Sequence, residues 1–182
     1  MKRLAHLGLT AALFAPLPLA AQMDSNMASP EAAASGFLSV YGSFHPSDGI
    51  PDMGSRARLQ PYLSPQLNTL LAAAAAAQAR FSAKIKDSPP LIEGDLFSSL
   101  FEGASQWKLQ ACTISGNQAR CPVAFAHTGS NTGKAANWTD TLLLVNTPQG
   151  WRVDDIAYGG GFQFGNTGRL SDTLKTVTRE TP

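Results

Sequence analysis

Three side chains of this sequence are candidates for acid–base chemistry: Asp155, Asp140 and Tyr158. We consider Asp155 first. Asp155 follows Asp154 in a stretch, 151–158, that we expect to be a strand. Successive side chains of a strand point to opposite faces, so the two carboxylates do not converge unless the strand is distorted. Strict alternation places Asp155 on the same face as Trp151 and Val153, among apolar neighbours.

Two roles are open for a carboxylate in such surroundings. A buried carboxylate needs hydrogen-bond donors, and our interpretation is that Asp155 is structural and accepts backbone N–H groups from the Gly94-Asp95 loop or another turn. Asp95 and Gly94 are structural as well, with Asp95 capping the turn that follows it. The alternative is a general base with a raised pKa, in a pocket that Asp140 and Tyr158 would join.

The residue patterns typical of metal, nucleotide and nucleophile sites are not found in this sequence. Its three histidines have no metal-ligand spacing, and we expect no metal and no cofactor. The run Gly159-Gly160-Gly161 fits neither the Walker pattern nor the dinucleotide fingerprint. The formal net charge is +1, which gives no electrostatic basis for nucleic acid or an anionic membrane as a partner.

The glycine run is followed by two phenylalanines, and this segment has two interpretations. If the rings are exposed, Gly160, Phe162 and Phe164 form a mobile aromatic lip that could hold a ligand. If the rings are buried, they close the hydrophobic core. We expect burial and keep the ligand lip as the alternative.

The two cysteines, Cys112 and Cys121, lie symmetrically about Gly116-Asn117. Gly-Asn is a two-residue hairpin signal, with glycine at the position that needs φ > 0. A turn centred there brings the two cysteines directly across from each other. We therefore predict a disulfide bond, which is typical of an oxidising compartment. Pro122 has no N–H for the ladder bond that this register requires, so we expect a bulge or an edge position there.

The N-terminus has the pattern of a secretory signal peptide. Basic residues precede an apolar stretch, 4–19, and small residues up to Ala21 allow cleavage. We expect residues 1–21 to be removed and residues 22–28 to be disordered. The apolar stretch is short and contains prolines, so we expect no membrane anchor. Export would place the protein in the periplasm or outside the cell.

Residues 29–180 are expected to form a single α+β domain. A serine followed by a proline, which is a helix-start signal, occurs at Ser29 and at Ser64, and apolar residues at helical spacing follow both. The second half has the alternation of an antiparallel meander, closed by a short helix near 170–177. Helices that precede an antiparallel sheet indicate the α+β class. The four expected strands are 106–114, 118–127, 137–146 and 151–158.

Three stretches resemble motifs of small exported bacterial proteins of unknown function: 89–97, 138–145 and 150–158. That family has a nuclear-transport-factor-2-like, or cystatin-like (SnoaL-like), fold. The resemblance covers roughly residues 30–178. It implies a curved, cone-like sheet with the N-terminal helices packed in its concave face, and it brings no established catalytic residues.

These observations lead us to expect an exported binding or interaction module without catalytic activity. Its partner would be an envelope protein, which it binds or inhibits, or a small apolar ligand. The resemblance also implies an alternative, an acid/base enzyme of the ketosteroid isomerase kind, with Asp155 or Asp140 as the base and Tyr158 as a hydrogen-bond donor. A cavity lined by these three side chains would favour the enzyme, whereas side chains aimed at backbone amides would not.

Overall fold

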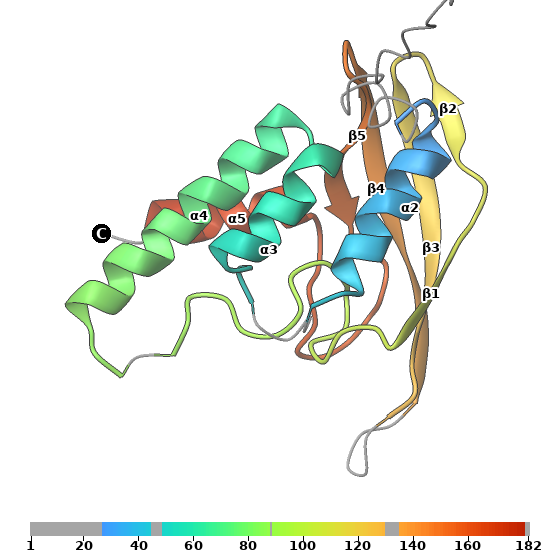
Figure 1. Ribbon diagram of the computed structural model, residues 1–182. Helices are drawn as coiled ribbons and strands as arrows, with labels where there is room; N and C mark the ends of the chain where they lie inside the picture. The colour runs from blue at the N-terminus through green and yellow to red at the C-terminus, as the bar shows by residue number, and fades with distance from the viewer. Residues whose placement is uncertain (1–26, 45–48, 88, 130–134, 181–182) are drawn as a thin grey trace, which may run out of the picture.

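The structure is a computed structural model, and it describes residues 27–44, 49–87, 89–129 and 135–180. In these residues the chain forms four α-helices and a five-stranded antiparallel sheet (Figure 1). Three of the helices precede the strands and one follows them, so the fold is α+β, as predicted. The expected signal peptide, 1–21, and residues 22–26 lie outside the described residues.

The helices and strands lie close to the segments expected from the sequence. The helices are α2 (Pro30–Tyr41), α3 (Met53–Leu59), α4 (Pro65–Lys84) and α5 (Leu170–Glu180), and a 3-10 turn, η1 (Gln60–Tyr62), follows α3. The strands are β1 (Gln106–Leu109), β2 (Thr113–Ser115), β3 (Gln118–His127), β4 (Ala136–Thr147) and β5 (Gly150–Ala157).

Serine side chains begin two of the helices, as the Ser-Pro signals predict. Ser29 Oγ accepts the N–H of Ala32 at 3.1 Å at the start of α2, and Ser64 Oγ accepts the N–H of Leu67 at 3.0 Å at the start of α4. Each bond satisfies one of the N–H groups that a helix leaves without a partner at its first turn.

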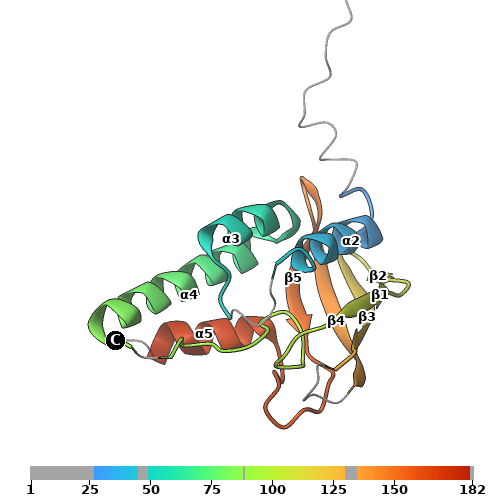
Figure 2. The same ribbon diagram turned by 60° about the horizontal axis from the view of Figure 1, so that its bottom comes forward.

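The strand order is β1-β3-β4-β5, with β2 paired to the same edge of β3 as β1. Helix α2 lies across one face of the sheet, α4 and α5 pack beside the edge strand β5, and α3 lies next to α2 (Figures 1 and 2). Leu63, just before α4, makes a parallel bridge to Val153 of β5. The helices therefore cover one face and one edge of the sheet.

The outer edge of the sheet is interrupted next to Pro122. β1 and β2 both pair with β3, but their registers differ by one residue. Residues 110–112 belong to neither strand and stand opposite only two residues of β3, Cys121 and Pro122. The expectation of a bulge or an edge position at Pro122 agrees with this register, because the extra residue lies opposite Pro122 and in the edge of the sheet. The interruption divides the expected strand 106–114 into two, so the sheet has five strands, and the expected count of four is wrong.

A second irregularity lies in β5. Leu143 of β4 pairs with Asp155, but Leu144 pairs with Val153, so Asp154 is an extra residue in β5. Such a bulge reverses the alternation of side chains beyond it. Asp155 therefore lies on the face opposite to Val153, and the expectation that the two share a face is wrong.

Aromatic side chains form much of the core between α2 and the sheet. Tyr41 of α2 has its ring centroid 6.2 Å from those of Phe97 and Phe125 and 6.0 Å from that of Trp107, in edge-on contacts. Phe125 in turn stacks on Trp138, with centroids 5.6 Å apart. This arrangement joins α2, the sheet and the loop that precedes β1 into one hydrophobic core.

The core also includes Met27, which falls in the segment 22–28 that the sequence indicated as disordered. Its side chain is 3% exposed, and its carbonyl accepts the N–H of Trp151 at 3.0 Å. Across the ranges that the structure describes, none of the helices has the length and apolarity that a bilayer crossing requires.

Candidate functional site

A buried loop without regular secondary structure links two of the carboxylates that the sequence singled out, Asp95 and Asp140. Residues 94–99 are all buried, and buried backbone groups outside helices and strands need other hydrogen-bond partners. Among the described residues, every buried side-chain N and O atom has such a partner. The positions of Asp95, Asp140 and Tyr158 follow from this requirement.

Asp95 holds its own loop to α2. Its carboxylate accepts the hydroxyl proton of Tyr41 at 2.5 Å and the N–H of Phe97 at 2.7 Å. The pKa of Asp95 is raised to about 6, chiefly by burial and to a smaller extent by the charge of Asp140, while the hydrogen bonds from Tyr41 and Phe97 act to lower it. Burial, followed by the charge of Asp95, raises the pKa of Tyr41 above its ordinary value. Asp95 thus caps the turn, as predicted, and its carboxyl also links the loop to α2.

Gly94 allows this loop to pack. Its φ is +75°, in the region that favours glycine. A Cβ at this position would lie 2.7 Å from the carbonyl oxygen of Phe101 and 2.6 Å from its ring. Because the Phe101 carbonyl accepts the N–H of Asp95 at 2.8 Å, a larger residue at Gly94 would separate two parts of the loop that are held together.

Asp140, on β4, fixes the other end of the buried loop. One carboxylate oxygen accepts the N–H of Ser99 at 2.8 Å and the indole N–H of Trp138 at 3.0 Å. The other accepts the N–H of Gly159 at 2.8 Å and the hydroxyl proton of Ser99. Four donors saturate this fully buried carboxylate, so it has no free position for a substrate proton.

Asp155 caps the start of α5 from the neighbouring strand. Its Oδ1 accepts the N–H groups of Ile156 and Ser171, both at 2.9 Å, and its Oδ2 accepts the Ser171 hydroxyl proton at 2.8 Å. Arg169 Nη1 lies 4.0 Å from Oδ2. The interpretation of Asp155 as an acceptor of backbone N–H groups agrees with these contacts, but the donors are Ile156 and Ser171 and not the expected Gly94-Asp95 loop. Asp155 also lines a polar pocket of about 290 Å³ with Asp154.

The three residues of the enzyme alternative do not meet at one site. The hydroxyl of Tyr158 donates to the carbonyl of Leu96 at 2.7 Å, and burial raises its pKa well above the ordinary value, with further contributions from the charges of Asp95 and then of Asp140 and Asp155. Asp140 and Tyr158 hold the same buried loop, whereas the bulge in β5 turns Asp155 to the opposite face of the sheet.

Asn166 is a part of this network that the sequence analysis missed. Its side-chain amide donates to the carbonyls of Asp95 at 2.6 Å and Ser98 at 2.7 Å, and its backbone N–H donates to the carbonyl of Ser99 at 3.0 Å. A single asparagine in a loop of small residues has no distinctive sequence pattern. Its role becomes visible only when the two loops are seen side by side.

An open cavity of about 400 Å³ lies between the two loops on their outer side. We call it the aromatic pocket, and it is lined by residues 100–102 and 162–165. Phe164 is 80% exposed and Phe101 40% exposed, so the expected burial of Phe164 is wrong. Phe162 is half-buried and meets Trp138 edge-on, with ring centroids 5.4 Å apart.

Gly160, the third residue expected in the lip, supports the ring of Phe162. A Cβ at Gly160 would lie 2.6 Å from that ring and 2.7 Å from Cβ of Ser99. The N–H of Gly160 also donates to the Ser99 hydroxyl at 3.0 Å. Of the three residues that the sequence indicated as a candidate ligand lip, Phe162 and Phe164 therefore line the aromatic pocket, whereas Gly160 lies behind the ring of Phe162.

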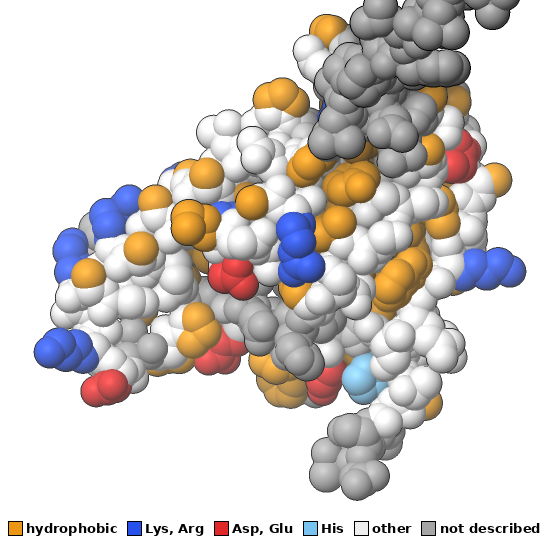
Figure 3. Space-filling model, viewed as in Figure 1, with side chains coloured by type: hydrophobic (Ala, Val, Ile, Leu, Met, Phe, Trp, Pro, Cys, Tyr) orange, Lys and Arg blue, Asp and Glu red, His pale blue; other side chains and the backbone are white. Residues whose placement is uncertain are grey.

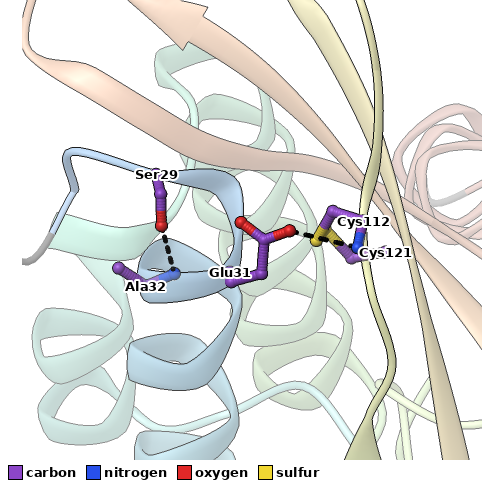
Figure 4. The surroundings of a disulfide bond; sticks show 5 residues. All are labelled: Ser29, Glu31, Ala32, Cys112 and Cys121. Atoms are coloured by element: carbon purple, nitrogen blue, oxygen red, sulfur yellow. Dashed lines mark hydrogen bonds between the residues drawn. A yellow bond between two sulfur atoms is a disulfide. The ribbon is translucent and has the colours of Figure 1, made fainter.

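The predicted disulfide bond joins Cys112 and Cys121, whose Cα atoms are 4.2 Å apart (Figure 4). The turn between them has Gly116 at φ +61°, as the hairpin signal requires. Figure 4 also shows that Glu31 of α2 accepts the N–H of Cys112, at 3.1 Å. The bridge therefore ties the interrupted edge of the sheet to β3, and a hydrogen bond ties it to the first turn of α2.

The side chains of the site were also compared with those that metal ions require. Among the residues described, no three His, Cys, Asp or Glu side chains are grouped so that they could hold a metal ion. The buried carboxylates of Asp95, Asp140 and Asp155 each accept hydrogen bonds from N–H and O–H donors, whereas a cation site needs several oxygen ligands directed at one point.

Comparison with known proteins does not identify a family for this chain. No protein-family model, no curated protein and no solved structure matches it. Its function is therefore inferred from its own residues and their geometry.

Proposed function

We propose that this chain is an exported binding module that holds a small apolar ligand, or an apolar group of an envelope protein, in the aromatic pocket. The exposure of Phe164, at 80%, beside the half-exposed Phe101 carries this proposal. Full burial of one phenylalanine side chain contributes about 1.5–3 kcal/mol. Clustered exposed apolar side chains are typical of interaction sites, and about 400 Å³ is in the range of ligand pockets.

Export is supported by two independent features. The first 21 residues have the pattern of a signal peptide, and a disulfide bond joins Cys112 to Cys121. Disulfide bonds form and persist in oxidising compartments such as the periplasm. The proposal therefore includes cleavage after Ala21 and a periplasmic or secreted location.

A cone-like fold of the nuclear-transport-factor-2-like kind is also part of the proposal. It is supported by the element order, with helices first and an antiparallel sheet second, and by the position of α2 across one face of the sheet (Figure 2). Proteins with this fold include both enzymes and binding modules, so function has to be argued from the site.

Binding is favoured over catalysis by the contacts of the candidate acids. Asp140 and Asp155 accept hydrogen bonds from backbone N–H groups and serine hydroxyls, and Tyr158 donates to a carbonyl. A general base needs an oxygen within reach of a substrate proton. Neither Asp140 nor Tyr158 lines the aromatic pocket.

The neutral, apolar dye Nile red can test the proposed binding site. We expect its emission to shift to the blue and saturate with the native chain, and Phe164→Ala to weaken binding roughly tenfold, the equivalent of about 1.4 kcal/mol. Met53→Ala is the matched control, because Met53 is 78% exposed and lies in another groove, on α3. Equal dye affinity of the native chain and Phe164→Ala would remove the aromatic pocket as the binding site.

Export is tested separately by expression of the full chain in a bacterium. We expect the mass of the periplasmic product to begin at Gln22 and titration of denatured protein to find no free thiol. An uncleaved cytoplasmic product with two free thiols would contradict the proposed export and leave the binding experiment to be judged by itself.

A further inference from the structure

The aromatic pocket has a charge as well as an apolar lining. Among its lining residues, 100–102 and 162–165, Glu102 is the one ionisable side chain, and the other polar side chain is the amide of Gln163. Glu102 is exposed. An apolar cavity that carries one carboxylate has a negative potential, which attracts a cationic ligand and repels an anionic one.

The rings that line the pocket are suited to an organic cation. The ring of Phe101 lies against Gly94 and that of Phe162 against Gly160, each so close that a Cβ would come within 2.6 Å of it. Phe162 is also held by its edge-on contact with Trp138. Phe164, at 80% exposure, completes the lining. Aromatic faces attract cations, and several rings around one cavity are the usual means of holding alkylated ammonium groups.

The loop before β1 and the loop after β5 lie side by side toward the lower end of the molecule as drawn in Figure 1. Figure 3 shows hydrophobic side chains next to acidic ones at this lower end of the molecule. A combination of apolar and acidic surface at one end fits a ligand that is itself apolar and positively charged.

We propose that the aromatic pocket binds a ligand whose apolar body carries an alkylated ammonium group, such as a trimethylammonium group. This inference rests on the proposed function and adds the charge of the ligand to it. A metal cation would need several oxygen ligands, whereas the pocket offers one carboxylate. The methyl groups of an alkylated ammonium contact the phenylalanine rings, and its positive charge is balanced by Glu102.

Three probes with the same hexyl chain test the charge preference: hexyltrimethylammonium, 1-hexanol and hexanesulfonate. Binding to the native chain is measured by isothermal titration calorimetry and by the change in total tryptophan fluorescence, to which Trp138, whose ring contacts Phe162, contributes. We expect the cation to bind roughly tenfold more tightly than the alcohol, because cation–π attraction and the carboxylate together contribute about 1–2 kcal/mol. The anion should bind most weakly.

Glu102→Gln removes the charge at the pocket, and Glu93→Gln is the matched control. Both glutamates are exposed, and Glu93 lies outside the pocket lining. We expect Glu102→Gln to weaken binding of the cation about three- to tenfold and to leave binding of 1-hexanol unchanged, while Glu93→Gln changes neither. Thermal unfolding checks that both variants stay folded.

The outcomes separate this inference from the proposed function. Equal affinities for the cation and the alcohol, with no effect of Glu102→Gln, overturn the ammonium preference and leave the apolar site intact. Tightest binding of the anion also overturns it. If none of the three probes binds at millimolar concentration, both the ammonium preference and the proposed apolar site are wrong.

Discussion

Asp95 gives this domain a pH dependence of stability that is opposite to the usual acid destabilisation. The carboxyl is buried against Tyr41 and Phe97, and burial raises its pKa from 3.8 to about 6. The folded state therefore takes up a proton at a pH where the unfolded chain does not. Stability from this group is fully present below the unfolded pKa and is lost as the pH rises through about 6.

The size of the effect follows from the shift in pKa. A change from 3.8 to about 6 corresponds to a maximum on the order of 3 kcal/mol. Between pH 7 and pH 5 the gain is about 1–2 kcal/mol, because the unfolded chain stays ionised over that interval. Asp52, an exposed cap whose pKa is lowered chiefly by the N–H of Ser55, loses its contribution only as the pH falls below about 4, outside this window.

Urea unfolding at pH 7, 6 and 5, followed by circular dichroism, measures the dependence. We expect the free energy of unfolding of the native chain to increase toward pH 5, and the increase to disappear in Asp95→Asn, which cannot ionise. The comparison of the two pH profiles removes contributions that other groups make equally to both. If the native chain loses stability between pH 7 and pH 5 in parallel with Asp95→Asn, the assignment of a raised pKa to Asp95 is refuted.

Three further predictions concern the bridge and the other two carboxylates. Cys112→Ser should lower the free energy of unfolding by about 2.5–3 kcal/mol, from the closed loop of separation 9, without preventing folding; an unchanged melting temperature relative to the oxidised native chain would contradict it. Asp140→Ala leaves four buried donors without their acceptor, and urea unfolding should show a free energy of unfolding lower by at least about 3–5 kcal/mol. The control Asp154→Ala, at a half-exposed position, should change the free energy of unfolding by less than about 0.5 kcal/mol. Asp155→Ala should cost about 1–2 kcal/mol and speed hydrogen exchange of the first-turn amides of α5, including Ser171; protection equal to that of the native chain would show that the cap is dispensable.

Local signals predicted the parts of the fold that are determined locally. The Ser-Pro pairs at Ser29 and Ser64 identified helix starts because the capping bond spans three residues. The hairpin register followed from a glycine that needs positive φ and two cysteines placed symmetrically about it. Even the interruption at Pro122 was predictable, because proline has no N–H to donate.

The parts that failed depend on partners that are distant in sequence. The bulge at Asp154 has no local signal, and the assumption of strict alternation therefore placed Asp155 on the wrong face. Asp140 reaches Ser99 across 41 positions, so its role could not be read from its neighbours on the strand. The exposure of Phe164 was missed for a similar reason, since apolar residues are by default expected to be buried.

The one-residue offset at residues 110–112 has a consequence for how copies of this protein meet. An open sheet edge offers its N–H and C=O groups to any other extended chain, and a long, regular edge is a risk for polymerisation. In the part of the chain that the structure describes, β1 and β2 form this edge with lengths of 4 and 3 residues. A straight incoming strand cannot keep register with both β1 and β2, so the irregularity next to Pro122 disfavours edge-to-edge pairing between copies of this chain.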